Sequence, residues 1–355
     1  MLGSGVQHIL ASFSYGEVKE KKGQNCLGLL LKQPVCGLCA AVCSSNALIL
    51  NKGVHISQDN CDQCGRCASV CPTGYLKLEG FSSGIVEKIS QRIGQGQQIF
   101  IFKCNNSRHQ VPNAVSVPCL CSLRAGYLVY WISLGARKIF YDISGCAVCD
   151  SEVQKCLDLE LRRARNLITA WHLPGEIITT DSLPTEIISA TSNSLQFSRR
   201  GFFEYLGRQA RTATRDIIES YLNNLGSNAT IQLPEDRLYL MDAFQRLGWI
   251  SVEKFSTGDL PWLDMVIKNG RCSTCHVCST FCPTGAIKRF EVNGKTEIRF
   301  LAARCVACGF CIAACPTHSL QPAKKTNIAM LRKERVLATG NAVVDSGPGG
   351  FMHEV

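Results

Sequence analysis

Two stretches near the C-terminus decide the fold: Arg271–Pro283 reads RCSTCHVCSTFCP, and Arg304–Pro316 reads RCVACGFCIAACP. Both have the spacing C-x2-C-x2-C-x3-C-P. In this pattern a cubane iron-sulfur cluster takes three thiolates from one tightly curved loop and the fourth from the other run. The fourth cysteine of each run therefore crosses to the other cluster and ties the two halves together. The spacing predicts two 4Fe-4S clusters in this region.

The crossed pattern divides these eight cysteines into two ligand groups. The groups are numbered in chain order, and groups 1 and 2 lie near the N-terminus. Group 3 comprises Cys272, Cys275, Cys278 and Cys315. Group 4 comprises Cys282, Cys305, Cys308 and Cys311. Zinc and disulfides are the alternatives, but structural zinc takes four ligands in separated pairs, and disulfides are rare in a reducing compartment. The doubled four-cysteine runs favour clusters over both.

A second pair of runs lies near the N-terminus and is less regular. The complete run consists of Cys61, Cys64, Cys67 and Cys71, followed by Pro72. The incomplete run consists of Cys36, Cys39 and Cys43. Gln33 stands where its first cysteine is expected, and Ser44 replaces the proline. The spacing therefore does not determine the complete ligand set of the cluster that belongs to the incomplete run.

Two arrangements satisfy the incomplete run. One is a three-iron cluster on Cys36, Cys39 and Cys71. The other recruits Cys26, which precedes a predicted strand at Leu27–Leu31 and brings this module to eight cysteines, as in the other module. We favour Cys26. Group 1 is then Cys26, Cys36, Cys39 and Cys71, and group 2 is Cys43, Cys61, Cys64 and Cys67.

Both cysteine arrays resemble bacterial two-cluster ferredoxins, over roughly Asn25–Leu78 and Val266–Leu320. The motifs are highly specific for iron-sulfur ligation. The resemblance implies, around each cluster pair, a small set of β-hairpins and short helices, and an electron-transfer function.

Between the arrays, apolar strands alternate with helices. Strands are predicted at Gln98–Phe102, Val115–Val117, Lys138–Ile143 and Glu176–Thr179, with helices at Leu123–Gly135 and Ser151–Trp171. This alternation predicts a parallel sheet covered by helices. Ligands of such sheets gather at the carboxyl ends of the strands.

Cysteines follow three of these predicted strands. The central group consists of Cys104, Cys119, Cys146 and Cys149. These thiols could converge on a further cluster, most simply a 2Fe-2S centre. A redox dithiol at Cys146-x2-Cys149 is the main rival, and ordinary buried core cysteines are the structural alternative.

The surroundings of these cysteines resemble the delta subunit of methyl-viologen-reducing hydrogenase, which serves heterodisulfide reductase. The matching stretches are Phe102–Asn105, Val117–Cys119, Leu134–Ala136 and Ser144–Cys146, within Gln97–Thr169. The resemblance implies electron transfer and a 2Fe-2S centre. The chain departs from that family at Ser107, where the family has a second cysteine.

Composition narrows the class of protein. The chain has 355 residues, 22 cysteines and a formal net charge of +10. Its basic residues are dispersed without interleaved base-stacking aromatics, which favours an acidic protein partner over nucleic acid. Apolar stretches are shorter than the roughly 20 residues of a membrane span, although peripheral association stays open, and Met1–Glu20 lacks the pattern of a secretory signal. We expect the cytoplasm.

These patterns predict an α+β chain in which two ferredoxin-like dicluster modules flank a small α/β parallel-sheet domain. The predicted parts are residues 1–82, 95–182, a helical connector at 183–262, 263–322, and a mobile tail at 323–355. The connector is expected to hold helices at Arg199–Leu225 and Pro234–Leu247. A flavin-type G-x-G-x-x-G turn is missing from the sequence.

The predicted function is relay of electrons between partner redox enzymes, such as a hydrogenase, a dehydrogenase or a heterodisulfide-reductase-like complex of anaerobic metabolism. The alternative is an oxidoreductase with its own dithiol, 2Fe-2S or flavin site in the middle domain. Turnover of a small molecule by the isolated chain would favour that alternative.

Overall fold

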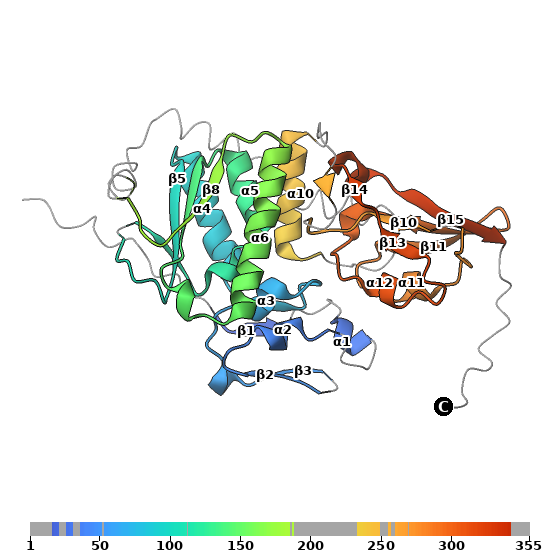
Figure 1. The fold of residues 1–355 in the computed structure, drawn as a ribbon, viewed down its shortest axis with the longest axis horizontal. Helices are drawn as coiled ribbons and strands as arrows, with labels where there is room; N and C mark the ends of the chain where they lie inside the picture. The colour runs from blue at the N-terminus through green and yellow to red at the C-terminus, as the bar shows by residue number, and fades with distance from the viewer. Residues whose placement is uncertain are drawn as a thin grey trace, which may run out of the picture.

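The computed structural model describes residues 16–20, 26–30, 36–51, 53–111, 113–184, 187, 233–248, 255–256, 260–268 and 270–341. Figure 1 shows three parts: an N-terminal module below, a central sheet with its helices above it, and a C-terminal module to one side. Buried side chains form one continuous hydrophobic core that reaches from Val18 to Leu331. The three parts are therefore packed into a single body. The predicted helix at Arg199–Leu225 lies outside the described residues.

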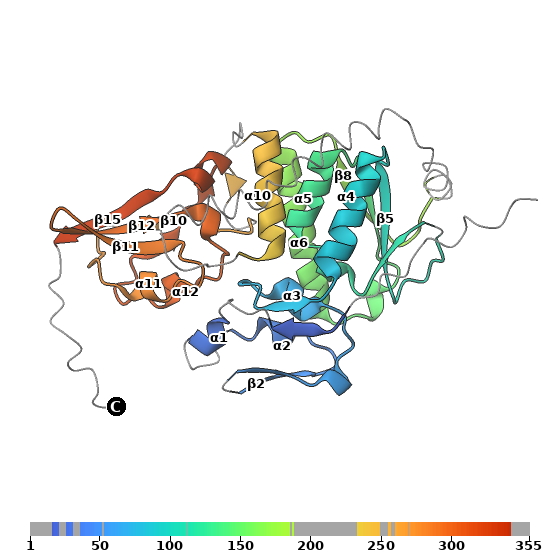
Figure 2. The same ribbon diagram turned by 180° about the vertical axis from the view of Figure 1, so that it is seen from behind.

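The central sheet has four parallel strands in the order β6-β5-β7-β8. They are β5 (Ile99–Cys104), β6 (Val115–Val117), β7 (Lys138–Asp142) and β8 (Glu176–Thr180). Helices α4 (Glu87–Gly94), α5 (Ala125–Leu134) and α6 (Ser151–Ala170) pack on one face (Figure 2). A separate small cluster around Ile101, Val111 and Phe140 covers the other face. The predicted mixed fold with a central parallel sheet is confirmed.

Helix α10 (Glu235–Leu247), from the segment predicted as a helical connector, packs against α5. The two helices come very close, since a Cβ on Gly126 would lie 2.1 Å from the Asp236 carbonyl oxygen. The Tyr239 ring lies 5.0 Å from that of Tyr130. At its far end, Phe244 packs on Trp262, 5.9 Å between ring centroids. This helix thus joins the sheet domain to the C-terminal module.

The N-terminal module consists of two small antiparallel sheets and short helices. Strand β1 (Val18–Glu20) pairs with β4 (Leu76–Leu78), and β2 (Leu48–Leu50) with β3 (Val54–Ile56). The helices are α1 (Leu27–Leu30), α2 (Leu38–Ala41) and α3 (Arg66–Val70). The prediction of a strand at Leu27–Leu31 was wrong, because this run of apolar residues forms a helical turn. A short apolar run has no periodicity that separates the two states.

Apart from α1, the described part of the C-terminal module repeats this order of elements. Strand β10 (Met265–Ile267) pairs with β13 (Leu320–Pro322), and β11 (Ile287–Val292) forms a hairpin with β12 (Lys295–Phe300). Its helices are α11 (Val277–Thr280) and α12 (Phe310–Ala313). The small strand pairs and short helices implied by the ferredoxin resemblance are therefore found in both modules.

The expectation of a mobile tail from residue 323 was wrong for the part that the structure describes. Strand β15 (Arg335–Asn341) pairs with β12 and makes the hairpin three-stranded, and β14 (Lys325–Thr326) pairs with β9 (Phe255–Ser256). Arg335 forms an ion pair with the buried Asp264. Basic residues here hold a strand edge in place, which composition alone does not show.

Short helical turns complete the described structure. They are η1 (Gln58–Asn60), η2 (Ser82–Val86), η3 (Leu120–Ser122), η4 (Cys146–Val148), η6 (Ala302–Arg304) and η7 (Ile328–Arg332). Of the described helices, none has the length and apolar character to cross a membrane.

Candidate metal centres

The cysteine loops of both modules share an unusual backbone conformation. Two residues after the first cysteine of each complete run, Gln63, Thr274 and Ala307 have φ of 51°, 53° and 54°. A left-handed backbone is uncommon for residues other than glycine, and for β-branched threonine it is an outlier. Such strain persists where the surrounding structure fixes it. The spacing of the run therefore dictates the curve of the loop, whichever residue occupies that position.

A second repeat follows the last cysteine of every run. Three residues after it, Asn46, Gly74, Gly285 and His318 all have φ between 47° and 68°. A hydroxyl also lies beside each of these four thiols, at 3.5 to 3.8 Å from sulfur to oxygen. The hydroxyls belong to Ser45, Thr73, Thr284 and Thr317. The sequence shows them as a Ser or Thr two residues after the last cysteine, a signal that our sequence analysis missed.

The thiols of the C-terminal module lie close together in two sets. Burial raises the pKa of Cys278 to about 12, and repulsion from the other three thiols of group 3 adds to it. Burial likewise raises the pKa of Cys308 to about 12 and raises that of Cys311, with repulsion from other thiols of group 4. In both groups, the last cysteine of one run thus lies next to the three loop cysteines of the other run.

Backbone amides point at several of these sulfurs. The N–H groups of Ala286 and Leu263 donate to Cys282 and Cys305, at 3.2 and 3.4 Å. Burial raises the pKa of Cys315, but hydrogen bonds from Ser319 and Thr317 outweigh burial and lower it to about 6. Donors around a sulfur stabilise the thiolate that binds metal. This environment fits the ligands of an iron-sulfur cluster.

The N-terminal module brings Cys26 to the incomplete run. Burial raises the pKa of Cys39 to about 11, and repulsion from the other three thiols of group 1, Cys26 included, contributes. Group 2 surrounds a small hollow between β1, β2 and the loop before α3, which all four of its cysteines line. Cys26, which directly precedes α1, thus lies near the other thiols of group 1.

The central group also comes together. Cys104 ends β5, Cys119 follows β6, and Cys146 and Cys149 lie after β7, so all four occupy the carboxyl edge of the sheet. Burial raises the pKa of Cys146 to about 12, with repulsion from the other three thiols. The loops approach closely, since a Cβ on Gly145 would lie 2.2 Å from the Asn106 carbonyl oxygen.

Ser107, where the resemblance would place a cysteine, has another partner. Its hydroxyl is hydrogen-bonded to Asp142, a fully buried carboxylate at the end of β7. Asp142 also accepts from the Ser144 backbone N–H at 3.0 Å and contacts His109 Nδ1 at 3.1 Å. This network fixes the two loops that carry the central group. The remaining cysteines, Cys121 and Cys156, hydrogen-bond to each other behind Cys119.

Arg66 lies between group 2 and the central group. Its Nε donates to Cys64 Sγ at 3.1 Å, and its Nη2 donates to Ser44 at 3.0 Å. Its charge also interacts with Cys119 and Cys149. One guanidinium thus faces thiols of both groups, which places the two groups side by side.

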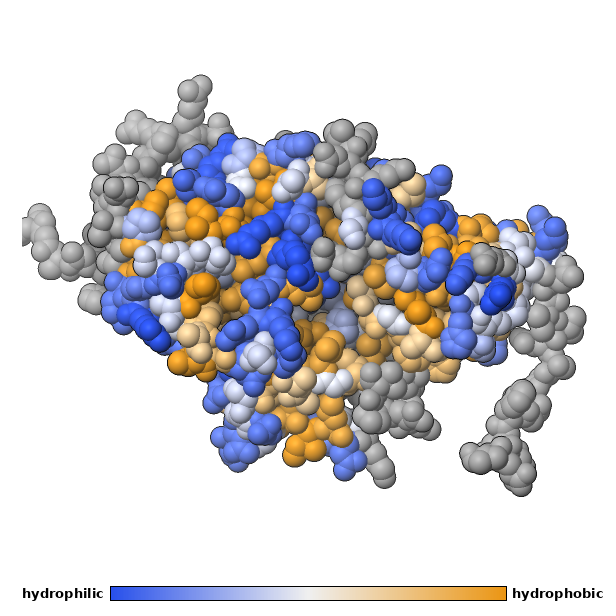
Figure 3. Space-filling view, viewed as in Figure 1, coloured by the Kyte–Doolittle hydropathy of each residue, from blue (hydrophilic) through white to orange (hydrophobic). Residues whose placement is uncertain are grey.

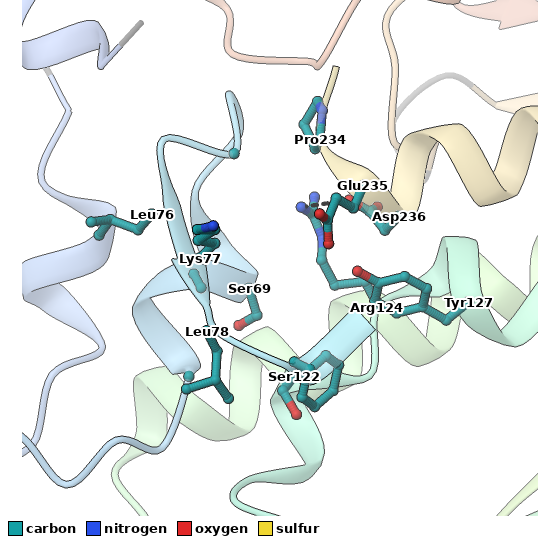
Figure 4. Close-up of a pocket in the computed structure, with 14 residues that line it drawn as sticks. Ser69, Leu76, Lys77, Leu78, Ser122, Arg124, Tyr127, Pro234, Glu235 and Asp236 are labelled. Carbon is teal, nitrogen blue, oxygen red and sulfur yellow. Dashed lines mark ion pairs between the residues drawn. The ribbon is translucent and has the colours of Figure 1, made fainter. Parts of the chain in front are cut away.

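The first turn of α10 lies between the two modules. A Cβ on Gly74, next to the group 1 loop, would lie 3.1 Å from the Pro234 Cα. Beside it is a pocket with an empty volume of about 530 Å3, part of it open to solvent. Figure 4 shows the Arg124–Asp236 ion pair on its wall, with a nitrogen–oxygen distance of 2.8 Å. On the other side of the turn, Arg237 reaches the C-terminal module.

Comparison with known proteins identifies both cysteine-rich modules. A family model described as a 4Fe-4S dicluster domain matches residues 22–75 and again 271–319. No curated protein and no solved structure matches the chain. Among the described residues, no three metal-binding side chains lie close enough to hold a single metal ion. Both modules thus match the 4Fe-4S dicluster domain model, and these matches support an iron-sulfur electron-transfer role.

Proposed function

We propose that the chain relays electrons between partner redox enzymes through four 4Fe-4S clusters, one on each of groups 1 to 4. The observation that carries the proposal is the repeated packing of the thiols, eight in each module, in two sets of four. Neighbouring sulfurs beneath a tightly curved backbone suit a cubane core, which takes one thiolate per iron. We assign the fourth ligand of the group 1 cluster to Cys26.

The central group is proposed to hold a 2Fe-2S centre, as the resemblance to the hydrogenase delta subunit implies. Support comes from the convergence of four thiols from three loops and from Arg66, whose charge faces both this group and group 2. A positive charge next to a cluster stabilises its reduced, more negative state. Electrons would then pass from the N-terminal module into the central domain.

The surface suggests where partners bind. Figure 3 shows hydrophobic residues gathered over the N-terminal module. Leu38 and Ile49, beside groups 1 and 2, are 51% and 58% exposed, and Val148, between two central cysteines, is 71% exposed. Exposed apolar patches mark interaction sites. We propose that subunits of a hydrogenase, a dehydrogenase or a heterodisulfide-reductase-like complex dock on this surface. The division of this chain into two modules and a central domain is proposed as predicted.

Anaerobic iron and acid-labile sulfide analysis, combined with EPR of the reduced protein, tests this proposal. About sixteen irons per chain are expected from four cubanes, and about eighteen if the central group holds a 2Fe-2S centre. Sixteen irons together with a redox-active Cys146–Cys149 pair would favour the central dithiol. An iron-poor, zinc-rich chain would overturn the electron-relay proposal.

A further inference from the structure

Arg237 is a buried cation at the boundary between the modules. Only 3% of it is exposed, and burial lowers its pKa to about 10, so it stays charged at neutral pH. Its Nε and Nη2 donate to the carbonyl oxygens of Ala303 and Ala302, at 3.3 and 3.2 Å. Those carbonyls belong to η6, which leads directly into Cys305. Arg237 is thereby fixed against the group 4 loop.

One donor of this guanidinium is left over. Arg237 Nη1 is buried and has no hydrogen-bond partner within the described part of the chain, while the charge of the side chain interacts with Cys305. The guanidinium also stacks on Trp262, 4.8 Å from the ring centroid, and this holds its plane. A buried donor without an acceptor loses its hydration and gains no hydrogen bond in return, which destabilises the folded state. Because Nε and Nη2 are fixed on the turn before Cys305 and the charge interacts with that thiol, the unpartnered Nη1 indicates an acceptor at the group 4 site.

The segment before Arg237 contacts the other module. Pro234 lies against Gly74, three residues after Cys71 of group 1, and Asp236 pairs with Arg124, whose charge also interacts with Cys71. Four consecutive residues of the chain therefore connect the surroundings of group 1 with those of group 4.

We propose that the first turn of α10 is the electron crossing between the two modules, and that Arg237 Nη1 donates a hydrogen bond to the group 4 cluster and raises its reduction potential. The inference rests on the proposed function. Each crossing moves one electron between group 1 and group 4 and neither forms nor breaks a bond. Because the added electron makes the cluster more negative, a cationic donor favours its reduced state. Arg237 thus acts on this transfer through the reduction potential of the group 4 cluster.

Potentiometric EPR titration of the anaerobic full-length chain tests the inference with Arg237→Gln. We expect full iron content and an about tenfold lower ratio of reduced to oxidised cluster at fixed potential, for one C-terminal cluster. For a one-electron couple this equals a downward shift of about 59 mV. Arg246→Gln is the matched control, because Arg246 lies on the same helix, is paired with Asp242, and should leave every potential unchanged.

A second substitution assigns the shift to group 4. In a background that carries both Cys308→Ala and Cys311→Ala, which removes that cluster, Arg237→Gln should shift no remaining potential. Unshifted potentials in an iron-replete Arg237→Gln chain would overturn the inference and leave the proposed function standing. If Arg237→Gln loses iron, Arg237→Lys is titrated in its place. A decrease of less than tenfold in the ratio of reduced to oxidised cluster at fixed potential agrees with the inference. An unchanged ratio overturns it. A wild-type chain without clusters would instead overturn the proposed function itself.

Discussion

The described parts of the N-terminal and C-terminal modules share one order of strands and helices except for the additional α1, and the arrangement of their cysteines differs. In the C-terminal module both runs are full, and β15 adds a third strand to its hairpin. In the N-terminal module one run lacks its first cysteine, and Cys26, from outside the run, lies next to the other three thiols of group 1. The difference indicates that the fold of the module, rather than the run alone, brings these four thiols together.

The largest expected effect is loss of a whole cluster, and it should be equal in the two modules. Cys308→Ala combined with Cys311→Ala, and Cys64→Ala combined with Cys67→Ala, each remove two of the four ligands of one group, so each double variant should lower the iron content by about four per chain. Iron analysis and EPR after anaerobic reconstitution measure this. Cys156→Ala, outside all proposed groups, is the control and should keep the full iron content. Retention of all iron in either ligand variant would contradict the assignment of that group.

Cys26→Ala should have a smaller effect and separates the modules. If Cys26 is the fourth ligand of group 1, its removal leaves three thiolates and converts that cluster to a three-iron form, with a loss of about one iron per chain. The EPR signal of an oxidised three-iron cluster would appear. A three-iron signal already present in the wild-type chain, unchanged by the substitution, would show that Cys26 is not a ligand.

Stability should also differ between the modules. Asp264 is buried and accepts from Thr326 at 2.8 Å as well as from Arg335. Asp264→Asn leaves the half-buried Arg335 without its counter-charge and should lower the free energy of unfolding by about 2 kcal/mol. In the N-terminal module, Glu20 accepts from Tyr75 at 2.5 Å but is exposed, so Glu20→Gln should cost less than about 1 kcal/mol. Anaerobic urea denaturation measures the free energy of unfolding of both variants. Equal losses for Asp264→Asn and Glu20→Gln would contradict this ranking.

Sequence patterns predicted the parts of the molecule whose signal is local. Strand and helix alternation predicted the parallel sheet, and cysteine spacing predicted ligand groups whose thiols the structure brings together. Contacts between distant segments could not be predicted in this way. Arg237 and Cys305 are 68 positions apart, and neither the basic composition nor the helical pattern of α10 shows which thiol this arginine faces. Leu27–Leu30 and Arg335–Asn341 differed from expectation because tertiary packing decides short or charged segments.

The smallest expected effect concerns the hydroxyls at the crossing cysteines. Cys315 has two, Ser319 at 3.4 Å and Thr317 at 3.5 Å, whereas its N-terminal counterpart Cys71 has Thr73 at 3.6 Å. Ser319→Ala removes one neutral hydrogen bond, worth about 1 kcal/mol, from the thiolate of group 3. The reduced cluster is then less stabilised, and the ratio of reduced to oxidised form at fixed potential should fall roughly fivefold. Redox titration followed by EPR measures the shift.

The matched control is Ser279→Ala, since the Ser279 hydroxyl donates to the His276 carbonyl oxygen instead of a thiol. Equal potentials for both variants would mean that these hydroxyls shape the loop without tuning the cluster.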